Sequence, residues 1–207
     1  MVEIIHNFAV FEGGDGTGTS TQLSLLEQRF QGGETVFFPT FEPTDGPVGE
    51  LIRASLKKEI SLYPGALARL FAADRTEHLY GRDGVLERCS RGELVVSDRY
   101  VLSSLVYQGI ECGDELPQSL NAPFPAPELV LFFDLDPKIA GERLRNRPTL
   151  ELYEHLEFQQ KVREKYLVLL GEYQKAGGRV EIIDASKSRE EVAEEVWSAI
   201  RKMPILR

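Results

Sequence analysis

Zinc ligands, a targeting leader and a broad basic surface are all missing from this 207-residue chain. The two cysteines, Cys89 and Cys112, form no CxxC pair, and His6, His78 and His155 complete no zinc-ligand spacing. The sequence shows no basic-plus-apolar leader and no run of about 18 apolar residues. We therefore expect a protein that neither spans a membrane nor is secreted, and that works in the reducing cytoplasm. The net charge of −9 argues against duplex nucleic acid as a partner, yet a few arginines suffice for a small anion.

Five short apolar runs rich in β-forming residues alternate with segments of helical period. They cover residues 8–12, 34–41, 93–99, 128–135 and 179–185. Such alternation predicts a parallel sheet covered by helices on both faces. The nearly continuous apolar runs LVVS and LVLFF fit strands that are buried on both faces. The chain length suits one domain over residues 1–207.

The connections carry start and stop signals. Asp136-Pro137 predicts a helix start, and Ser188 with Glu191 predicts a capping box. Apolar spacing predicts a long helix near 156–175. The proline-rich stretch 111–127 predicts an irregular connection, and the polar stretch 145–156 predicts a surface flap.

FEGGDGTGTSTQ, residues 11–22, has the pattern of a phosphate-binding loop without its lysine. In G-x-x-x-x-G-K-[ST], Gly13, Gly18 and Ser20 fall in register, but Thr19 stands where lysine belongs. Backbone N–H groups could still hold phosphate, and Ser20 could bind Mg²⁺. A plain glycine turn capped by a hydroxyl is the alternative. A unit charge about 4 Å away is worth about 4 kcal/mol at an effective dielectric of 20, so another cation is expected to take part.

Asp98, Arg99 and Tyr100 end the third predicted strand. Ligands bind at the carboxyl ends of strands in open α/β sheets. An aspartate there can hold Mg²⁺ through water, and an arginine can clamp a phosphate with its planar fork. A structural salt bridge at a strand end is the alternative interpretation.

Two helical faces are candidates for a base-binding pocket. Phe71 and Arg75 are four residues apart, so they could stack on a base and contact its carbonyl edge. Ser104, Tyr107 and Gln108 share one face of an otherwise apolar helix. The alternatives are a core phenylalanine beside a surface ion pair, and a solvated polar face.

Three arginines precede the predicted flap: Arg143, Arg145 and Arg147. They could close on the phosphates of ATP. The alternative is an exposed basic turn that complements the dipole at a helix C-terminus.

In their order along the chain, these segments resemble the thymidylate kinase (dTMP kinase) family. The resemblance covers nearly the whole chain and rests above all on LFAADR and on DRYVLSSLVYQG, with further matches in TFEPTDGPVGELIR, PELVLFFDLDP, LEFQQKVREKYL and IIDAS. It implies an α/β fold of the P-loop NTPase type: a three-layer α/β/α sandwich with a five-stranded parallel sheet and a short lid near 143–156. It also implies a homodimeric, Mg²⁺-dependent kinase that transfers the γ-phosphoryl group of ATP to dTMP and forms dTDP.

The resemblance assigns roles residue by residue. Phe71 would stack on thymine, Arg75 would contact its edge, and Tyr107 would disfavour a 2′-hydroxyl. The implied catalytic residues are Asp15, Arg99, Arg143, Arg145 and Arg147. The implied ATP-binding residues are Gly13, Gly14, Asp15, Gly16, Thr17, Gly18, Thr19, Ser20 and Thr21. The implied dTMP-binding residues are Glu42, Phe71, Arg75, Arg99, Ser103, Ser104, Tyr107 and Gln108, and the implied Mg²⁺ ligands are Ser20 and Asp98.

Three departures from the family pattern leave alternatives open. Thr19 replaces the loop lysine, Phe41 stands where bacterial relatives often have an arginine, and residues 148–155 contain no arginine. One alternative is therefore a catalytically weak or inactive nucleotide-binding homologue. Another, motivated by Phe41 alone, is a kinase with a different monophosphate substrate.

Overall fold

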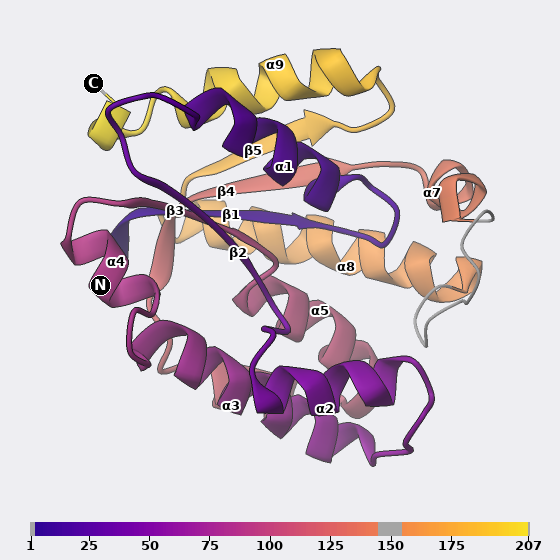
Figure 1. Ribbon diagram of the computed structural model, residues 1–207. Helices are drawn as coiled ribbons and strands as arrows, with labels where there is room; N and C mark the ends of the chain where they lie inside the picture. The colour runs from indigo at the N-terminus through magenta and orange to yellow at the C-terminus, as the bar shows by residue number, and fades with distance from the viewer. Residues whose placement is uncertain (1–2, 145–154, 207) are drawn as a thin grey trace.

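The computed structural model describes residues 3–144 and 155–206 (Figure 1). Its strands are β1 (Ile4–Gly13), β2 (Phe37–Phe41), β3 (Leu94–Asp98), β4 (Ala126–Asp134) and β5 (Val180–Asp184). Its α-helices are α1 (Thr19–Phe30), α2 (Pro47–Leu56), α3 (Pro64–Tyr80), α4 (Val85–Ser90), α5 (Val101–Cys112), α6 (Glu115–Asn121), α7 (Pro137–Leu144), α8 (Leu156–Lys175) and α9 (Arg189–Ile200). A short 3₁₀ turn, η1 (Pro204–Leu206), follows α9.

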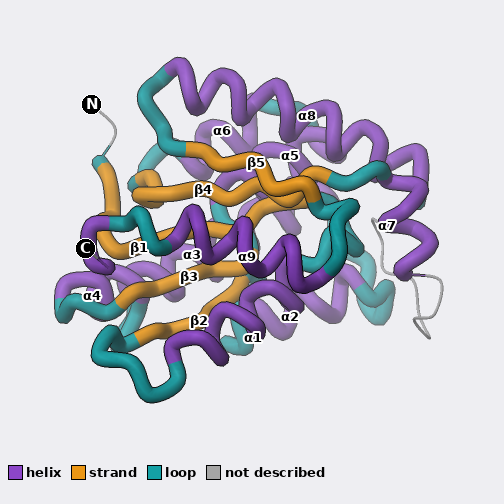
Figure 2. The backbone as a smooth tube through the Cα atoms, turned by 90° about the horizontal axis from the view of Figure 1, so that it is seen from above, coloured by secondary structure: helices purple, strands orange, loops and turns teal. Residues whose placement is uncertain are grey.

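The strands form one sheet in the order β2-β3-β1-β4-β5, and each neighbouring pair is parallel. Figure 2 shows them side by side in this order. All five residues of β3 are buried, as are Leu129 to Phe133 of β4. The predicted five-stranded parallel sheet, with central strands buried on both faces, is confirmed.

Helices cover both faces of the sheet, so the molecule has three layers (Figure 1). On one face α1 and α9 pack around Leu26, Val196 and Ile200. On the other face α2, α3, α5 and α8 surround a second cluster that includes Val106 and Tyr166. The β1, β3 and β4 carboxyl ends meet at one edge of the sheet, because parallel strands point the same way.

The helix predictions hold in most places. Helix α8 matches the predicted 156–175 segment, and Ser188 and Glu191 form the predicted capping box of α9. At the start of α7 the Asp136 carboxylate accepts a hydrogen bond from the Lys138 backbone N–H at 2.8 Å. Residues 145–154 of the predicted flap lie outside the described residues.

The prediction of an irregular connection over residues 111–127 is wrong in part, because α6 forms inside it. Pro117 is the third residue of this helix. The first N–H groups of a helix have no partner within the helix, so a proline there removes no hydrogen bond. The Asn121 side chain then donates to the Pro117 carbonyl at 2.8 Å.

Candidate active site

The phosphate loop joins β1 to α1 in a tight turn. Gly16 and Gly18 have φ angles of 81° and 94°, a backbone conformation that favours glycine. The Thr17 hydroxyl donates to the Gly14 carbonyl at 2.8 Å and holds the turn closed. Because α1 begins at Thr19, the positive end of its dipole faces the same side as the loop. These features suit an anion bound by backbone groups.

A cavity of about 590 Å³ lies against this loop, and we call it the donor cavity. Loop residues Gly14 to Thr21 form one wall, and Asp98 and Arg99 from the end of β3 form another. The remaining lining comes from α1, α7, the connection after β5 and the first turn of α9: Gln22, Arg143, Leu144, Ala185, Lys187, Arg189 and Val192.

Ser20 and Asp98 meet at the floor of the donor cavity. The Ser20 hydroxyl donates to Asp98 Oδ2 at 2.5 Å. Asp98 is 8% exposed, and its buried Oδ1 has no hydrogen-bond partner among the described residues. Hydroxyl and carboxylate oxygens are ligands that Mg²⁺ accepts. The pair therefore fits the metal that the sequence predicts here.

No lysine side chain extends from the loop itself, but other cations line the donor cavity. Arg143 donates from Nη2 to the Ala185 carbonyl at 3.0 Å, so its charge is not neutralised by that contact. Lys187 is ion-paired with Glu195, and Arg189 lies 3.2 Å from Glu190. Of these three, Arg143 is the one that contacts a neutral carbonyl rather than a carboxylate, so it keeps a net positive charge beside the loop.

Arg99 lies between the donor cavity and a second cavity, and it lines both. Its backbone has a φ of 75°, unusual for a residue with a side chain. The guanidinium donates to the Gly13 carbonyl at 3.0 Å and to Asp15 Oδ1 at 2.6 Å. The Arg99 guanidinium is thus fixed at the boundary between the two cavities.

Asp15 also lines both cavities, and three side chains hold it. Besides Arg99, the Tyr107 hydroxyl donates to Oδ1 at 3.2 Å. The Gln159 amide donates to Oδ2 at 2.6 Å and accepts from the Asp15 backbone N–H at 3.0 Å. This cross-link joins the loop to α5 and α8, so the loop aspartate has one fixed orientation.

The second cavity, which we call the acceptor cavity, has a volume of about 130 Å³. It brings together the two helical faces that the sequence singles out, from α3 and α5. Ser104 and Gln108 are each 2% exposed, so the solvated-face interpretation of this helix is wrong. The lining residues are Asp15, Glu42, Pro43, Leu56, Phe71, Arg75, Arg99, Tyr100, Ser103, Ser104, Tyr107 and Gln108.

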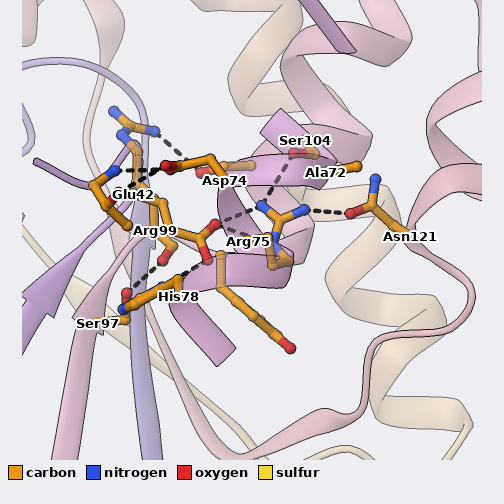
Figure 3. A network of polar contacts seen from close by, with 12 residues as sticks. Glu42, Ala72, Asp74, Arg75, His78, Ser97, Arg99, Ser104 and Asn121 are labelled. Carbon is orange, nitrogen blue, oxygen red and sulfur yellow. Dashed lines mark hydrogen bonds and ion pairs between the residues drawn. The ribbon is translucent and has the colours of Figure 1, made fainter. Parts of the chain in front are cut away.

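Arg75 is buried in a network of paired groups at the acceptor cavity (Figure 3). Its guanidinium donates to Glu42 Oε2 from Nε at 3.0 Å and from Nη2 at 2.6 Å. Nη2 also donates to Ser104 at 3.1 Å, and Nη1 donates to Asn121. The alternative of a surface ion pair for Arg75 is therefore wrong.

Glu42 carries the negative charge of this network. Burial would raise the pKa of its carboxyl group, but Arg75 and His78 together lower it below the usual value. His78 Nδ1 lies 3.0 Å from Glu42 Oε1, and His78 Nε2 lies 2.7 Å from Thr40 Oγ1. The Glu42 carboxylate is thus held ionised between Arg75 and His78. Glu42 and Arg75 both line the acceptor cavity.

The sequence profile of the thymidylate kinase family matches residues 11–196 of the chain. A relative from Treponema pallidum whose name reads thymidylate kinase is 43% identical over 97% of this chain and 98% of its own length. A probable thymidylate kinase of Pyrobaculum aerophilum is 41% identical over 95% of this chain and 97% of its own length. A third, from Methanococcus maripaludis, is 36% identical over 95% of this chain and 96% of its own length.

The chain belongs to the thymidylate kinase family. The geometry shows where its departures from the family pattern lie. Thr19 is 8% exposed and lines the donor cavity. Phe41 is 43% exposed at the end of β2, and neither cavity lining within the described residues includes it. Arg145 and Arg147 lie outside the described residues.

Several residues that shape this thymidylate kinase site were not singled out from the sequence. Gln159 reaches it only through the folding of α8, whereas His78 lies three residues after Arg75 on α3, and this helical spacing could have marked it. Lys187 and Arg189 follow the last strand, so the rule that ligands bind at strand ends could have marked them.

Proposed function

We propose a division of labour among these residues in a reaction that transfers the γ-phosphoryl group of ATP to dTMP. ATP binds in the donor cavity with its phosphates against the loop, and dTMP binds in the acceptor cavity. The observation that carries this assignment is that Arg99 and Asp15 line both cavities. The two phosphate groups would meet at the Arg99 guanidinium.

The reaction needs positioning and charge neutralisation more than proton transfer. A phosphate oxygen of dTMP attacks the γ-phosphorus, and the bond from this phosphorus to the β–γ bridging oxygen breaks, which releases ADP. Arg99 stabilises the charge of the transferring group from the side. Ser20 and Asp98 would hold Mg²⁺, which supplies further neutralisation when bound. No general base is required, since the attacking oxygen is already ionised.

Base recognition falls to the acceptor cavity. Phe71 stacks on thymine, and Arg75 contacts a carbonyl of its edge while Glu42 and Asn121 keep the guanidinium fixed. Tyr107, tied to Asp15, lies under the deoxyribose and leaves no room for a 2′-hydroxyl. Gln108, with a buried Oε1 that has no partner among the described atoms, completes the set facing the base.

Arg143 takes over the charge that the loop lysine supplies elsewhere in the family. This assignment is supported by the contact of Arg143 with the neutral carbonyl of Ala185 beside the loop, because a carbonyl, unlike a carboxylate, does not neutralise the charge there. The 43% identity over 97% of this chain to a relative named as a thymidylate kinase favours an enzyme over an inactive homologue. We also infer a cytoplasmic homodimer, in line with the family resemblance and with free thiols at Cys89 and Cys112; a monomer mass in light scattering would contradict the dimer.

A coupled assay of ADP release with dTMP, dUMP, dCMP and dGMP tests this proposal. We expect turnover to be fastest with dTMP. If no monophosphate is turned over while dTMP still raises the melting temperature, the chain binds nucleotides without acting as a kinase. Preference for another monophosphate would instead favour the altered-substrate alternative.

A further inference from the structure

Glu12, the penultimate residue of β1, is a buried carboxylate that the mechanism above does not use. It is 1% exposed and lines neither the donor nor the acceptor cavity. Its Oε2 accepts hydrogen bonds from the Ser103 hydroxyl at 2.6 Å and from the Tyr166 hydroxyl at 2.9 Å. Its Oε1 accepts from the backbone N–H groups of Tyr100 at 3.1 Å and Ser103 at 3.3 Å.

These four donors come from the turn that presents Arg99 and from α8. Arg99 precedes Tyr100 directly and has a backbone conformation that side chains rarely adopt. Its Nη1 lies 3.3 Å from the Ser103 hydroxyl oxygen, which is the same hydroxyl that donates to Glu12. The Glu12 carboxylate thus binds the backbone on one side of Arg99 and the hydroxyl that contacts its guanidinium.

An ionised carboxylate fits this arrangement better than a protonated one. All four neighbours donate to it, so both oxygens act as acceptors. A protonated Oε2 would have to donate to Ser103 or Tyr166, and one of these hydroxyls would have to turn away. Ser103 and Tyr166 lie 2.8 Å apart, so turning one changes the other.

We propose that Glu12 is a positioning residue for phosphoryl transfer, and that its ionised form holds the turn from Arg99 to Ser103 so that Arg99 points between the two cavities. The proposal rests on the role proposed for Arg99. Glu12 itself touches no nucleotide site, so its effect on the reaction passes through the turn.

Glu12 changes its protonation state within the pH range in which enzyme activity can be measured. Burial raises its pKa to about 7, although Ser103, Arg99 and Tyr166 each act to lower it. Among the described residues, the ionisable groups that act on Glu12 are Arg99, which follows β3, and Tyr166 from α8. On β4, the residue paired with Glu12 is the apolar Phe132. Asp15 and Tyr107 act on Arg99 from its other side.

The first test is the pH dependence of kcat and KM from about pH 6 to about pH 9 for the wild type and Glu12→Gln. We expect the wild-type kcat to fall as the pH drops through about 7, as Glu12 takes up its proton. Glu12→Gln should lose roughly 10- to 100-fold in kcat at high pH, with a smaller change in KM, and should lose this pH step. The substrate phosphates also titrate near pH 6, but they do so equally in both proteins. An unchanged kcat or an unchanged profile in Glu12→Gln would overturn the proposal.

Tyr166→Phe gives a second test that keeps the carboxylate. Removing this donor should move the midpoint of the kcat profile to higher pH, because the Tyr166 hydrogen bond lowers the Glu12 pKa. A midpoint that stays in place, or moves down, contradicts the proposal. This variant also serves if Glu12→Gln fails to fold.

A third measurement needs no catalysis. The pKa of Glu12 is raised on folding, so the stability that this group contributes is present below about pH 4.5 and is lost as the pH rises through about 7. The melting temperature of the wild type minus that of Glu12→Gln should therefore fall between about pH 5 and about pH 8, by an amount on the order of 5 °C. A constant difference would overturn the titration of Glu12, whatever the activity. A normal rate in Arg99→Ala would instead overturn the role of Arg99, and with it the positioning role, while leaving this difference intact.

Discussion

The donor and acceptor cavities meet at Arg99, yet they handle charge in opposite ways. On the acceptor side, Arg75 and Glu42 have side chains only 1% and 2% exposed and are paired with each other. On the donor side, Lys187 and Arg189 side chains are 41% and 64% exposed, and Arg143 contacts a neutral carbonyl. The charges at the acceptor cavity are thus buried and paired, whereas the cations at the donor cavity are exposed or contact a neutral group.

Because of this difference, we expect the donor cavity to tolerate the loss of a cation and the acceptor cavity not to tolerate it. Removing one partner of a buried pair leaves the other charge uncompensated, so the acceptor set has to be kept whole. A donor cavity bordered by several cations can lose the loop lysine and keep a positive charge near the phosphates. On the role proposed for Arg143, Thr19 is tolerated in the donor cavity for this reason, whereas a similar loss at Arg75 would leave Glu42 without its main partner.

The largest expected effect comes from breaking the buried pair. Arg75→Ala should lower the free energy of unfolding by about 3–5 kcal/mol, because Glu42 then stays buried without its main partner. Arg189→Ala, at an exposed pair, should cost no more than about 1 kcal/mol. Chemical denaturation of both variants measures the contrast, and equal losses would mean that the two cavities do not differ in this way.

Arg99→Ala should lower kcat by roughly 10²–10³-fold, since it removes a fixed donor from the transferring phosphoryl group. Steady-state rates at saturating ATP and dTMP measure this. Arg99→Lys keeps the charge but loses the planar fork, so it should recover only part of the rate. A rate near that of the wild type in Arg99→Ala would remove Arg99 from the transfer step.

Arg143→Ala tests the donor side. We expect kcat/KM for ATP to fall about 10-fold or more, because a charge-assisted hydrogen bond to phosphate is worth about 1.5–3 kcal/mol. The matched control is Arg189→Ala, because this exposed guanidinium is already paired with Glu190 and its loss should matter by less than about 1 kcal/mol. If Arg189→Ala has the larger effect, the compensating charge comes from the start of α9.

Tyr107→Phe should give the smallest change. It removes the hydroxyl that donates to Asp15 but keeps the aromatic ring at the acceptor cavity. A single hydrogen bond is worth about 1 kcal/mol, which corresponds to roughly fivefold in kcat/KM for dTMP. A loss as large as that of Arg99→Ala would mean that the Asp15 network, rather than Arg99 alone, aligns the phosphates.

Much of the fold could be predicted because its signals are local. The apolar runs gave all five strands, and Ser188 with Glu191 gave the start of α9. The helix α6 could not be predicted in this way, because Pro117 reads as a helix breaker unless its place in the first turn is known. The free energy that α6 gains by packing against α5 is also not visible in the local sequence.

The same distinction applies to the site. Ser20 could be placed from the phosphate-loop pattern and Asp98 from its strand end, and the structure brings the Ser20 hydroxyl to 2.5 Å from Asp98 Oδ2. Two partners that set the charges could not be placed: Asn121 reaches Arg75 from α6, and Gln159 reaches Asp15 across 144 residues. His78, which contacts Glu42, is an exception because it shares α3 with Arg75. Motifs mark the residues that face a ligand, while folding determines the residues that hold them.

The central claim is that the donor cavity works without the loop lysine because Arg143 supplies the charge. The most direct measurement is kcat/KM for ATP in Thr19→Lys, in Arg143→Ala and in the double variant. We expect kcat/KM for ATP to be unchanged or lower in Thr19→Lys alone. In the double variant, Thr19→Lys should restore the activity that Arg143→Ala loses. A large rise in Thr19→Lys alone would show that the native loop is impaired and would contradict the account.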